Sequence, residues 1–355
     1  MDIETQNNKV FSGPIAIWCI TPNGKGIALK IKAGFKDSTL FFSSGIIKKT
    51  RSGKNTFIFK KLSKEIHYRF NKFQGHVFIF STGIAVRIIA PLLKSKTIDP
   101  AVVVVDDNGN HAISLISGHL GGANLLTKEI AGAINAAPVI TTATDTNFLP
   151  AIDIIAKKRK LFIETPENIK HVNMAFLMGV PVDLYDPSGF LKNHLPDTFL
   201  TSAADIGTAK GKIYCSYEIK NVSRGTLILR PPVLNIGIGC NRNTGLKEIK
   251  LFLLKVLKKG GLSPASIRRF ATTEVKKDEP GLLALSREMK IKMDFYGKKE
   301  LNSVKTIMTP SKMVEKHLGV KSVCEAAAIL SAGNGRLIVP KKKNKDVTIA
   351  VAIKK

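Results

Sequence analysis

Short apolar runs rich in β-branched and aromatic residues alternate with stretches of helical periodicity in the first part of the chain. This pattern predicts buried strands over 77–80 and 101–105, with a helix over 83–93 between them. The polar turn at 107–110 leads into a further strand over 111–117. Strands that alternate with helices in this way are typical of an α/β sandwich.

The same alternation continues to the C-terminus. Apolar residues at helical spacing from Leu126 to Ile134 predict a helix. The less regular middle of the chain predicts a helix over 168–178 and strands over 212–218 and 226–229. The last third predicts, in chain order, a strand over 233–238, a helix over 244–257, a strand over 267–273, a helix over 280–289, a strand over 291–295, a helix over 323–330 and strands over 337–339 and 347–353.

Two breaks in the pattern suggest domain boundaries. Arg230-Pro231-Pro232 is a stiff, non-helical break before a new apolar strand, and a softer boundary lies near Pro138. We therefore expect a multidomain α/β protein, with a Rossmann-like open sheet in an N-terminal domain (1–138), a smaller central domain (139–230) and a separate α/β C-terminal domain (231–355).

Charge adds information about partners. The 355 residues include 55 Lys or Arg and 27 Asp or Glu, which gives a net charge of +28. The three expected domains carry +10, +2 and +16 in chain order, so a cleft between the two basic domains would suit a polyanion. Nucleic acid, an anionic membrane surface or a small molecule with many carboxylates or phosphates would fit this charge. The alternative is that each domain has an ordinary Lys-rich solvated surface.

Several function classes are disfavoured by absent features. No run of about 18 uncharged apolar residues predicts a membrane span, and the acidic, polar N-terminus does not resemble a secretory signal. The four cysteines are far apart, so we expect a cytoplasmic protein with no metal site of its own. The aromatic content of 7% argues against stacking platforms for nucleic acid.

The densest group of candidate functional residues lies between an expected strand and an expected helix, over 117–124. Free N–H groups at a helix start bind anions, and glycines allow a ligand to approach the backbone. His119 can act as an acid or a base near neutral pH. The candidate substrate-binding residues here are Ser117, Gly118, Gly121, Gly122 and Asn124. The alternative is a tight turn whose histidine caps the helix or faces water.

Two further turns follow expected strands. The small-residue turn at 81–87 contains the candidate substrate-binding residues Thr82, Gly83 and Arg87. Thr82 can cap a helix, and Arg87 can bind a carboxylate through two hydrogen bonds. After the strand expected over 138–142, Thr142 and Thr144 line a strand end, with Asp145 as a candidate general base. An ordinary cap with a surface arginine, and a capping turn, are the respective alternatives.

The C-terminal third holds a glycine-rich turn at 237–244. It shares only its first two glycines with a dinucleotide fingerprint, and Arg242 replaces the third, so we do not predict NAD binding. Its candidate substrate-binding residues are Gly237, Gly239, Cys240, Arg242 and Thr244. Cys240 at a helix start is either a reactive thiol or, as we favour, a buried small residue.

Three more polar features occur in this third of the chain. Lys276 can contact a substrate carboxylate, or lie in a solvated loop. Glu325 stands in an Ala-rich helix, where it is either functional or complements the helix dipole. The basic run 341–345 is interpreted as a solvated turn between two strands.

Long segments of the chain resemble the cobalt-precorrin-5A hydrolases of anaerobic cobalamin biosynthesis. The N-terminal segments are TGIAVR (82–87), DPAVVVVDDNG (99–109), ISLISGHLGGAN (113–124) and PVITTATD (138–145). The C-terminal segments are NIGIGCNRNTGLKEI (235–249), ATTEVKKDEPGL (271–282) and GVKSVCEAAAIL (319–330). Order and spacing match from about residue 70 onward. Asn241 and Asn243 depart from the family pattern, which often has a basic residue and a glycine there.

The resemblance implies a specific reaction. Water opens the ring-A δ-lactone of cobalt-precorrin-5A, and the two-carbon bridge leaves as acetaldehyde to give cobalt-precorrin-5B. The substrate is a polycarboxylate cobalt-corrinoid, so cobalt arrives with it and no cofactor of the protein's own is expected. Neighbouring pathway enzymes are further expected partners, whereas nucleic acid and membranes are not.

We assign roles for this chemistry by inference from the residues. Activation of water and stabilisation of a developing oxyanion are required. His119 is the expected acid or base, and Asp145 or Glu325 the expected proton shuttle. The amides of Gly121 and Gly122 are expected to hold an oxyanion or a carboxylate, and Arg87, Arg242 and Lys276 to contact substrate carboxylates. Two alternatives remain open, a non-catalytic corrinoid-binding protein and a basic nucleic-acid-binding protein.

Overall fold

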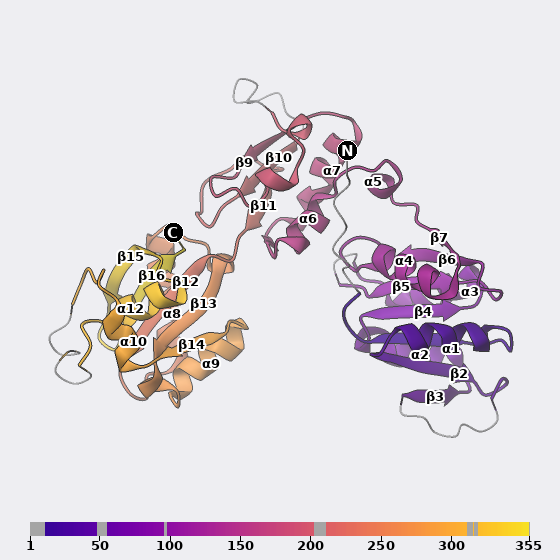
Figure 1. Ribbon diagram of the computed structural model, residues 1–355, viewed down its shortest axis with the longest axis horizontal. Coiled ribbons are helices and arrows are strands. Elements are labelled where there is room, and N and C mark those ends of the chain that lie inside the picture. Colours follow the sequence, from indigo (N-terminus) through magenta and orange to yellow (C-terminus); the bar gives the residue numbers. More distant parts are fainter. Residues whose placement is uncertain are drawn as a thin grey trace. The chain divides into compact units, whose positions relative to one another are not determined.

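The chain divides into two compact units, Met1–Ile154 and Ile155–Lys355. The computed structural model describes residues 11–47, 55–95, 98–201, 211–310, 315 and 319–354. The first unit is built on one seven-stranded sheet, and the second contains a four-stranded and a five-stranded sheet (Figure 1). This arrangement confirms a multidomain α/β protein.

The sheet of the first unit has the order β3-β2-β1-β4-β5-β6-β7. Its strands are β1 (Ile15–Cys19), β2 (Ser38–Ser43), β3 (Thr56–Phe59), β4 (Gly75–Ile79), β5 (Ala101–Val105), β6 (His111–Ile116) and β7 (Ala137–Val139). The helices are α1 (Gly24–Gly34), α2 (Leu62–Arg69), α3 (Thr82–Ile89), α4 (Ala123–Ile134) and α5 (Ala143–Thr146). The boundary between the units falls within α6 (Ile152–Lys158).

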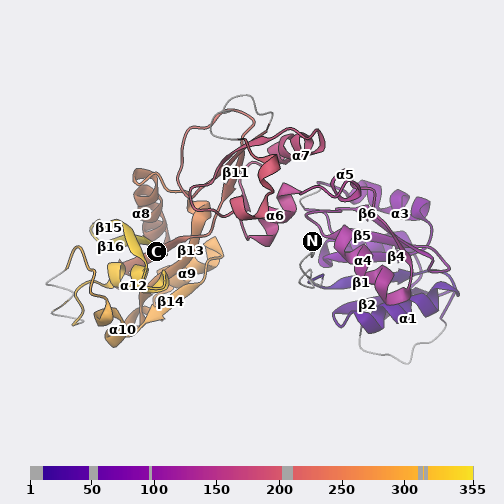
Figure 2. The same cartoon turned by 45° about the horizontal axis from the view of Figure 1, so that its top comes forward.

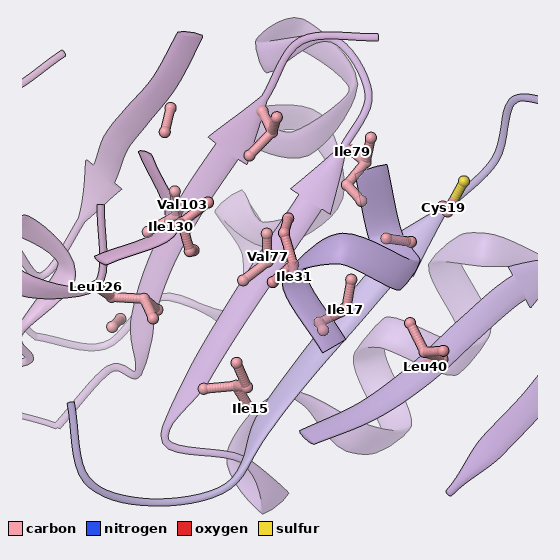
Figure 3. Close-up of a cluster of buried hydrophobic side chains, with 14 of the residues drawn as sticks. Ile15, Ile17, Cys19, Ile31, Leu40, Val77, Ile79, Val103, Leu126 and Ile130 are labelled. Atoms are coloured by element: carbon pink, nitrogen blue, oxygen red, sulfur yellow. The ribbon is translucent and has the colours of Figure 1, made fainter. Parts of the chain in front are cut away.

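Successive strand residues point to opposite sides of the sheet, so its apolar strands give it two apolar faces. Helices cover both of them. Ile15 and Ile17 pack with Ile31 of α1 and Ile130 of α4 in one apolar cluster (Figure 3). Trp18, the residue after Ile17, points to the other face, where α2 and α3 pack. A parallel sheet buried on both sides requires nearly continuous apolar strands, and β5 has that composition.

Strand direction determines which loops share an edge of the sheet. Strands β1 to β5 are parallel, but β6 pairs antiparallel with β5, and β7 pairs parallel with β6. The carboxyl ends of β6 and β7 therefore lie at the opposite edge from the carboxyl ends of β1, β4 and β5. The loop after β6 faces the segment that precedes β5, where Ser117 Oγ donates a hydrogen bond to Asp99 O at 3.0 Å.

The second unit contains a small sheet of order β8-β11-β10-β9 and a larger one of order β14-β13-β12-β16-β15. The small sheet is formed by β8 (Phe162–Ile163), β9 (Val182–Tyr185), β10 (Gly211–Cys215) and β11 (Leu227–Arg230), with α7 (Ile169–Leu177). The larger sheet is formed by β12 (Leu234–Cys240), β13 (Ile267–Thr273), β14 (Met293–Tyr296), β15 (Arg336–Lys343) and β16 (Val347–Ile353), with α8 (Leu246–Lys259), α9 (Pro280–Met289), α10 (Lys298–Ser303) and α12 (Val323–Ser331).

Several predicted elements differ from those observed. The helix predicted over 83–93 ends at Ile89 and continues as a 3-10 turn, since Pro91 has no N–H to donate. The strand predicted over 138–142 ends at Val139, before α5 begins. The basic turn predicted over 341–345 is wrong for its first three lysines, which are the last residues of β15. Lys342 and Lys343 pair with residues of β16.

Candidate functional site

The loop between β6 and α4 holds the densest group of predicted site residues. Ser117 and Gly122 both adopt left-handed backbone conformations, with φ of 60° and 89°. The Ala123 N–H donates to Ser117 O at 3.1 Å, and the Gly122 N–H to His119 O at 3.1 Å. A Cβ at Gly121 would lie 2.3 Å from Ser117 Cβ, so only glycine fits there. The loop thus has one defined conformation, which positions the His119 side chain.

Two aspartates hold the His119 ring from opposite sides. Nε2 lies 2.9 Å from Asp145 Oδ2 in α5, and Nδ1 lies 3.4 Å from Asp153 Oδ2 in α6. The Thr144 hydroxyl also lies 3.1 Å from Nε2. The side chains of His119, Asp145 and Asp153 are 14%, 24% and 6% exposed, so the solvent-facing acid is Asp145.

This arrangement raises the pKa of His119 above its ordinary value. The hydrogen bond to Asp153 is the largest cause, burial opposes it, and the charge of Asp153 and the contact with Asp145 add to it. A doubly protonated ring can donate to both carboxylates, whereas a neutral ring can donate to only one. The raised pKa favours the protonated ring, whose Nε2 side faces the more exposed carboxylate.

Asn124 connects this cluster to the strand behind it. Its Nδ2 donates to Asp145 Oδ2 at 2.9 Å and to Thr142 Oγ1 at 3.0 Å, while its Oδ1 accepts from Ser114 Oγ at 2.7 Å. A Cβ at Gly118 would lie 2.7 Å from Asn124 Oδ1. The structure thus brings together the predicted residues at 117–124 and 142–145, and it shows Asn124 as a buried support for Asp145 rather than an exposed contact.

The two predicted oxyanion donors in this loop differ. The Gly122 amide is engaged by His119 O, which argues against it as a donor to substrate. The Gly121 amide donates to no atom of the residues that the structure describes. Of the pair, Gly121 retains the capacity to bind an oxyanion.

Thr82, Gly83 and Arg87 lie elsewhere. They follow β4, so they are at the sheet edge opposite to His119. Ser81 rather than Thr82 is the N-cap residue of α3, and no side-chain cap bond forms, so the predicted capping role of Thr82 is wrong. Arg87 is exposed and makes no ion pair with any residue in the described part of the chain.

In the second unit, the turn after β12 meets the turn after β13. Arg242 Nη1 lies 2.7 Å from Asp278 Oδ1, and Lys276 Nζ lies 3.1 Å from Glu279 Oε2. The Asn243 N–H donates to Glu279 Oε1 at 2.8 Å. Both predicted cations are therefore already paired with carboxylates of their own unit, and a substrate carboxylate would have to compete with these contacts.

Four other predicted residues of this turn have structural roles. A Cβ at Gly237 would lie 1.8 Å from Cys324 O, since α12 packs directly on β12. A Cβ at Gly239 would lie 2.5 Å from Thr348 Oγ1. Thr244 Oγ1 donates to Asn241 O at 2.9 Å. Burial raises the pKa of the Cys240 thiol to about 11, with smaller effects from nearby charges, so it carries no thiolate near neutral pH.

Glu325, also predicted as catalytic, is fully buried in α12. Its carboxylate accepts hydrogen bonds from the Met308, Thr309 and Lys341 N–H groups, each at 2.9 Å, and from Thr309 Oγ1 at 2.7 Å. Burial raises the pKa of Glu325, but these hydrogen bonds together lower it by more, so the net shift is downward. The carboxylate joins a loop and a strand to α12 and holds no proton to transfer.

Asp153 was missed by the sequence analysis. Its signal is an acidic residue in the first turn of a short helix, within the apolar run 151–156 that follows Pro150. An ordinary interaction with the helix dipole explains that pattern equally well. Across the described ranges, no group of three or more His, Cys, Asp or Glu side chains has the arrangement of a metal site.

Comparison with known proteins places three family models on the chain in order. They are described as "Cobalamin synthesis G N-terminal" (residues 65–145), "Cobalamin biosynthesis central region" (150–231) and "Cobalamin synthesis G C-terminus" (234–352). Together they span most of the chain, including both turns that carry the predicted site residues.

Curated relatives match over nearly the whole length. The cobalt-precorrin-5A hydrolase of Priestia megaterium is 34% identical, covering 96% of this chain and 95% of the relative. The enzyme of the same name from Salmonella typhimurium is 30% identical, covering 98% and 99%. A solved cobalamin biosynthesis protein G homolog from Sulfolobus solfataricus is 24% identical, covering 96% of this chain and 97% of its own, with a TM-score of 0.37. None of the described helices has the length and apolar character needed to span a bilayer.

Proposed function

This chain belongs to the cobalt-precorrin-5A hydrolase family, and we propose that it catalyses the reaction for which those relatives are named. In that reaction water opens the ring-A δ-lactone, and the two-carbon bridge then leaves as acetaldehyde. The observation that carries the proposal within the structure is the ring of His119 between Asp145 and Asp153. It provides a proton donor and acceptor in one half-buried place.

The first step needs proton transfer in two directions. Water loses a proton as it adds to the lactone carbonyl, and the ring oxygen gains one as it leaves. Asp145, the more exposed of the two carboxylates, is the candidate to take the proton of the attacking water, and protonated His119 is the candidate to supply the proton that the departing ring oxygen gains. The Gly121 N–H is the candidate donor to the oxyanion that forms on the carbonyl oxygen.

The second step breaks a carbon–carbon bond. Lactone opening leaves a hydroxyl group on the two-carbon unit. Loss of the hydroxyl proton allows the oxygen to form the aldehyde C=O, while the electron pair of the broken bond passes to the macrocycle, which takes up a proton. The same pair of groups, His119 and Asp145, suits this exchange because the ring is returned to its starting charge at the end.

Asp153 acts as a positioning residue in this scheme. It is almost fully buried and contacts Nδ1, so it fixes the ring orientation and favours the protonated form. We further propose that the protein needs no cofactor of its own, because cobalt enters within the substrate. We place the reaction in the cytoplasm, with neighbouring pathway enzymes as partners for the unstable macrocycle and no role for nucleic acid.

The decisive experiment is anaerobic incubation of the purified protein with cobalt-precorrin-5A. Mass spectrometry of the macrocycle and chemical trapping of the aldehyde are expected to show loss of the two-carbon unit with stoichiometric acetaldehyde. A bound but unchanged macrocycle would replace the proposal with a corrinoid-binding function. His111→Ala, at an exposed histidine of the same unit, is the control that should retain full turnover.

A further inference from the structure

A groove in the second unit is lined by none of the predicted site residues. It has a volume of about 1070 Å³ and is lined mainly by residues of α8 and β15. Figure 2 labels these two elements. Cavities that hold small molecules have comparable volumes, ~300–1,000 Å³. Its lining includes Lys342 and Lys343, the strand residues that the sequence pattern had predicted as a solvated turn.

The rim of the groove is strongly basic. Its lining includes Lys247, Lys255, Lys259, Lys342 and Lys343, all exposed, and none makes an ion pair within the described part of the chain. Glu248 is the single acidic residue of the lining. Elsewhere on α8 the cation Lys250 is paired, with Glu288 Oε1 at 2.6 Å. The lysines at the groove therefore remain available for an anionic ligand.

The spacing along α8 reinforces this. Residues 247, 251, 255 and 259 are four apart, so they lie along one side of the helix, and three of them are lysines. Like charges at this spacing repel each other and destabilise a helix. Lys255 and Lys259 form such a pair, and a bound polyanion would remove the repulsion between them.

The floor of the groove is apolar. Leu251, Phe252, Ile338 and Pro340 line it, and Leu251 is 59% exposed although it lies in the middle of a helix. Phosphate groups alone would bind to lysines without needing such a floor. A ligand with a flat apolar body and several carboxylates at its edge matches both the floor and the rim.

We propose that this groove binds a polycarboxylate macrocycle of the tetrapyrrole class, with its ring against the apolar floor and its carboxylates on the lysines of α8 and β15. The ligand class rests on the proposed function, but the site is separate from His119, which belongs to the first unit. The groove gives the second unit its own affinity for the substrate or product.

The test uses the full-length chain and uroporphyrin, a stable octacarboxylate macrocycle, as the probe. Its dissociation constant is measured by absorbance titration at fixed salt. Lys255→Glu, Lys259→Glu and Lys342→Glu together should weaken binding at least ~10-fold, about one factor of ten per 1.4 kcal/mol lost. Leu251→Glu should weaken it as well, because it places a charge on the apolar floor.

The matched control changes the same charge elsewhere in the same unit. Lys292, Lys299 and Lys305 are exposed, lie outside the groove and make no described ion pair. Their replacement by Glu should leave the dissociation constant within about twofold. Equal weakening by both triple variants would show a non-specific charge effect and overturn the proposal, as would no weakening by the groove variant. Should the Glu variant not fold, Lys255→Gln with Lys259→Gln provides the same test.

The two proposals fail differently. Suppose that uroporphyrin binding depends on the groove but cobalt-precorrin-5A is not converted. The groove would then stand as a macrocycle-binding site, and the proposed hydrolase function would be wrong. If the groove variant instead converts cobalt-precorrin-5A with an unchanged KM and binds uroporphyrin as before, the hydrolase function would stand and the groove proposal would be wrong. A 20-nucleotide RNA serves as competitor, and groove-dependent RNA binding tighter than that of uroporphyrin would replace the macrocycle as occupant.

Discussion

Two regions of this molecule bury carboxylates beside polar partners, and they use them in opposite ways. In the first unit, Asp145 and Asp153 face a titratable ring, His119. In the second unit, Glu325 faces three backbone N–H groups and a threonine hydroxyl. The first arrangement contains a group that can gain and lose a proton, the ring whose pKa its neighbours raise. The second has none, because amides do not titrate.

The same contrast applies to the other charged site of the second unit. Glu279 is fully buried and accepts hydrogen bonds from the Asn243 N–H and from Lys276, which are fixed donors. Such contacts hold a loop in one conformation. Burial of an acidic residue is therefore insufficient evidence of catalysis, and the nature of its partner decides. The following predictions test that distinction.

The largest effect is expected from the ring itself. His119→Gln removes the titratable group but keeps hydrogen-bonding atoms, so kcat should fall by ~10²–10⁴-fold, the range typical of general acid–base groups. KM should change much less. Steady-state turnover of cobalt-precorrin-5A measures both. Unchanged kcat in a folded variant would remove His119 from the mechanism.

A second histidine of the same unit provides an opposite case. His76 is fully buried, accepts from Trp18 Nε1 at 3.1 Å, and donates to Phe70 O at 2.9 Å, with no carboxylate beside it. Burial lowers its pKa to about 4, against a slight rise from the hydrogen bond to Phe70. Because the unfolded chain binds the proton more readily, stability is complete above pH ~6.5 and falls as the pH decreases toward 4, by roughly 3 kcal/mol.

Urea unfolding between pH 4 and 7.5 measures this loss. Trp18 is the single tryptophan of the chain and lies in the core of the first unit, so its fluorescence reports that unit. His76→Gln keeps both hydrogen-bonding capacities without the titration, and its stability should depend less on pH in this range. Equal slopes for the two proteins would show that His76 does not control the acid sensitivity.

The third effect concerns the carboxylate in the second unit. Glu325→Gln replaces a charged acceptor of four hydrogen bonds with a neutral one, which should destabilise the second unit by about 1–3 kcal/mol. The Trp18 fluorescence transition should not move, whereas the far-ultraviolet circular dichroism transition should occur at lower urea. At a temperature where the variant is folded, kcat should stay within a few-fold of the parent value. A loss as large as that of His119→Gln would make Glu325 part of the reaction.

Local periodicity was sufficient for much of the fold. The observed bounds of β5, β13, α9 and β16 equal the predicted ones, because each is an apolar run or amphipathic stretch bounded by turn residues. The reversal of β6 was not predicted, although a signal existed. Only residues 106–110 connect β5 to β6, and a parallel crossover needs a dozen or more residues.

That reversal explains why the candidate site was only partly anticipated. Local patterns identified His119, Asn124 and Asp145, but not that Thr82 and Arg87 lie at the other edge of the sheet. Asp153 could not be found from spacing, because its contact with His119 depends on how the chain returns after β7. Contacts between side chains of separate elements depend on tertiary packing, and the local periodicity of the sequence does not predict them.

The smallest effect that still separates the two regions is a shift in pH dependence. Asp153→Asn removes the main cause of the raised pKa of His119, while burial continues to lower it, so the His-linked limb of the pH–rate profile should move to lower pH. Asp145→Asn, at the more exposed of the two acids, should instead lower kcat across the whole profile. Histidine titration by NMR on the free protein checks the same direction without turnover. If Asp153 served only to fold α6, its replacement would reduce stability and leave both the limb and the NMR titration in place.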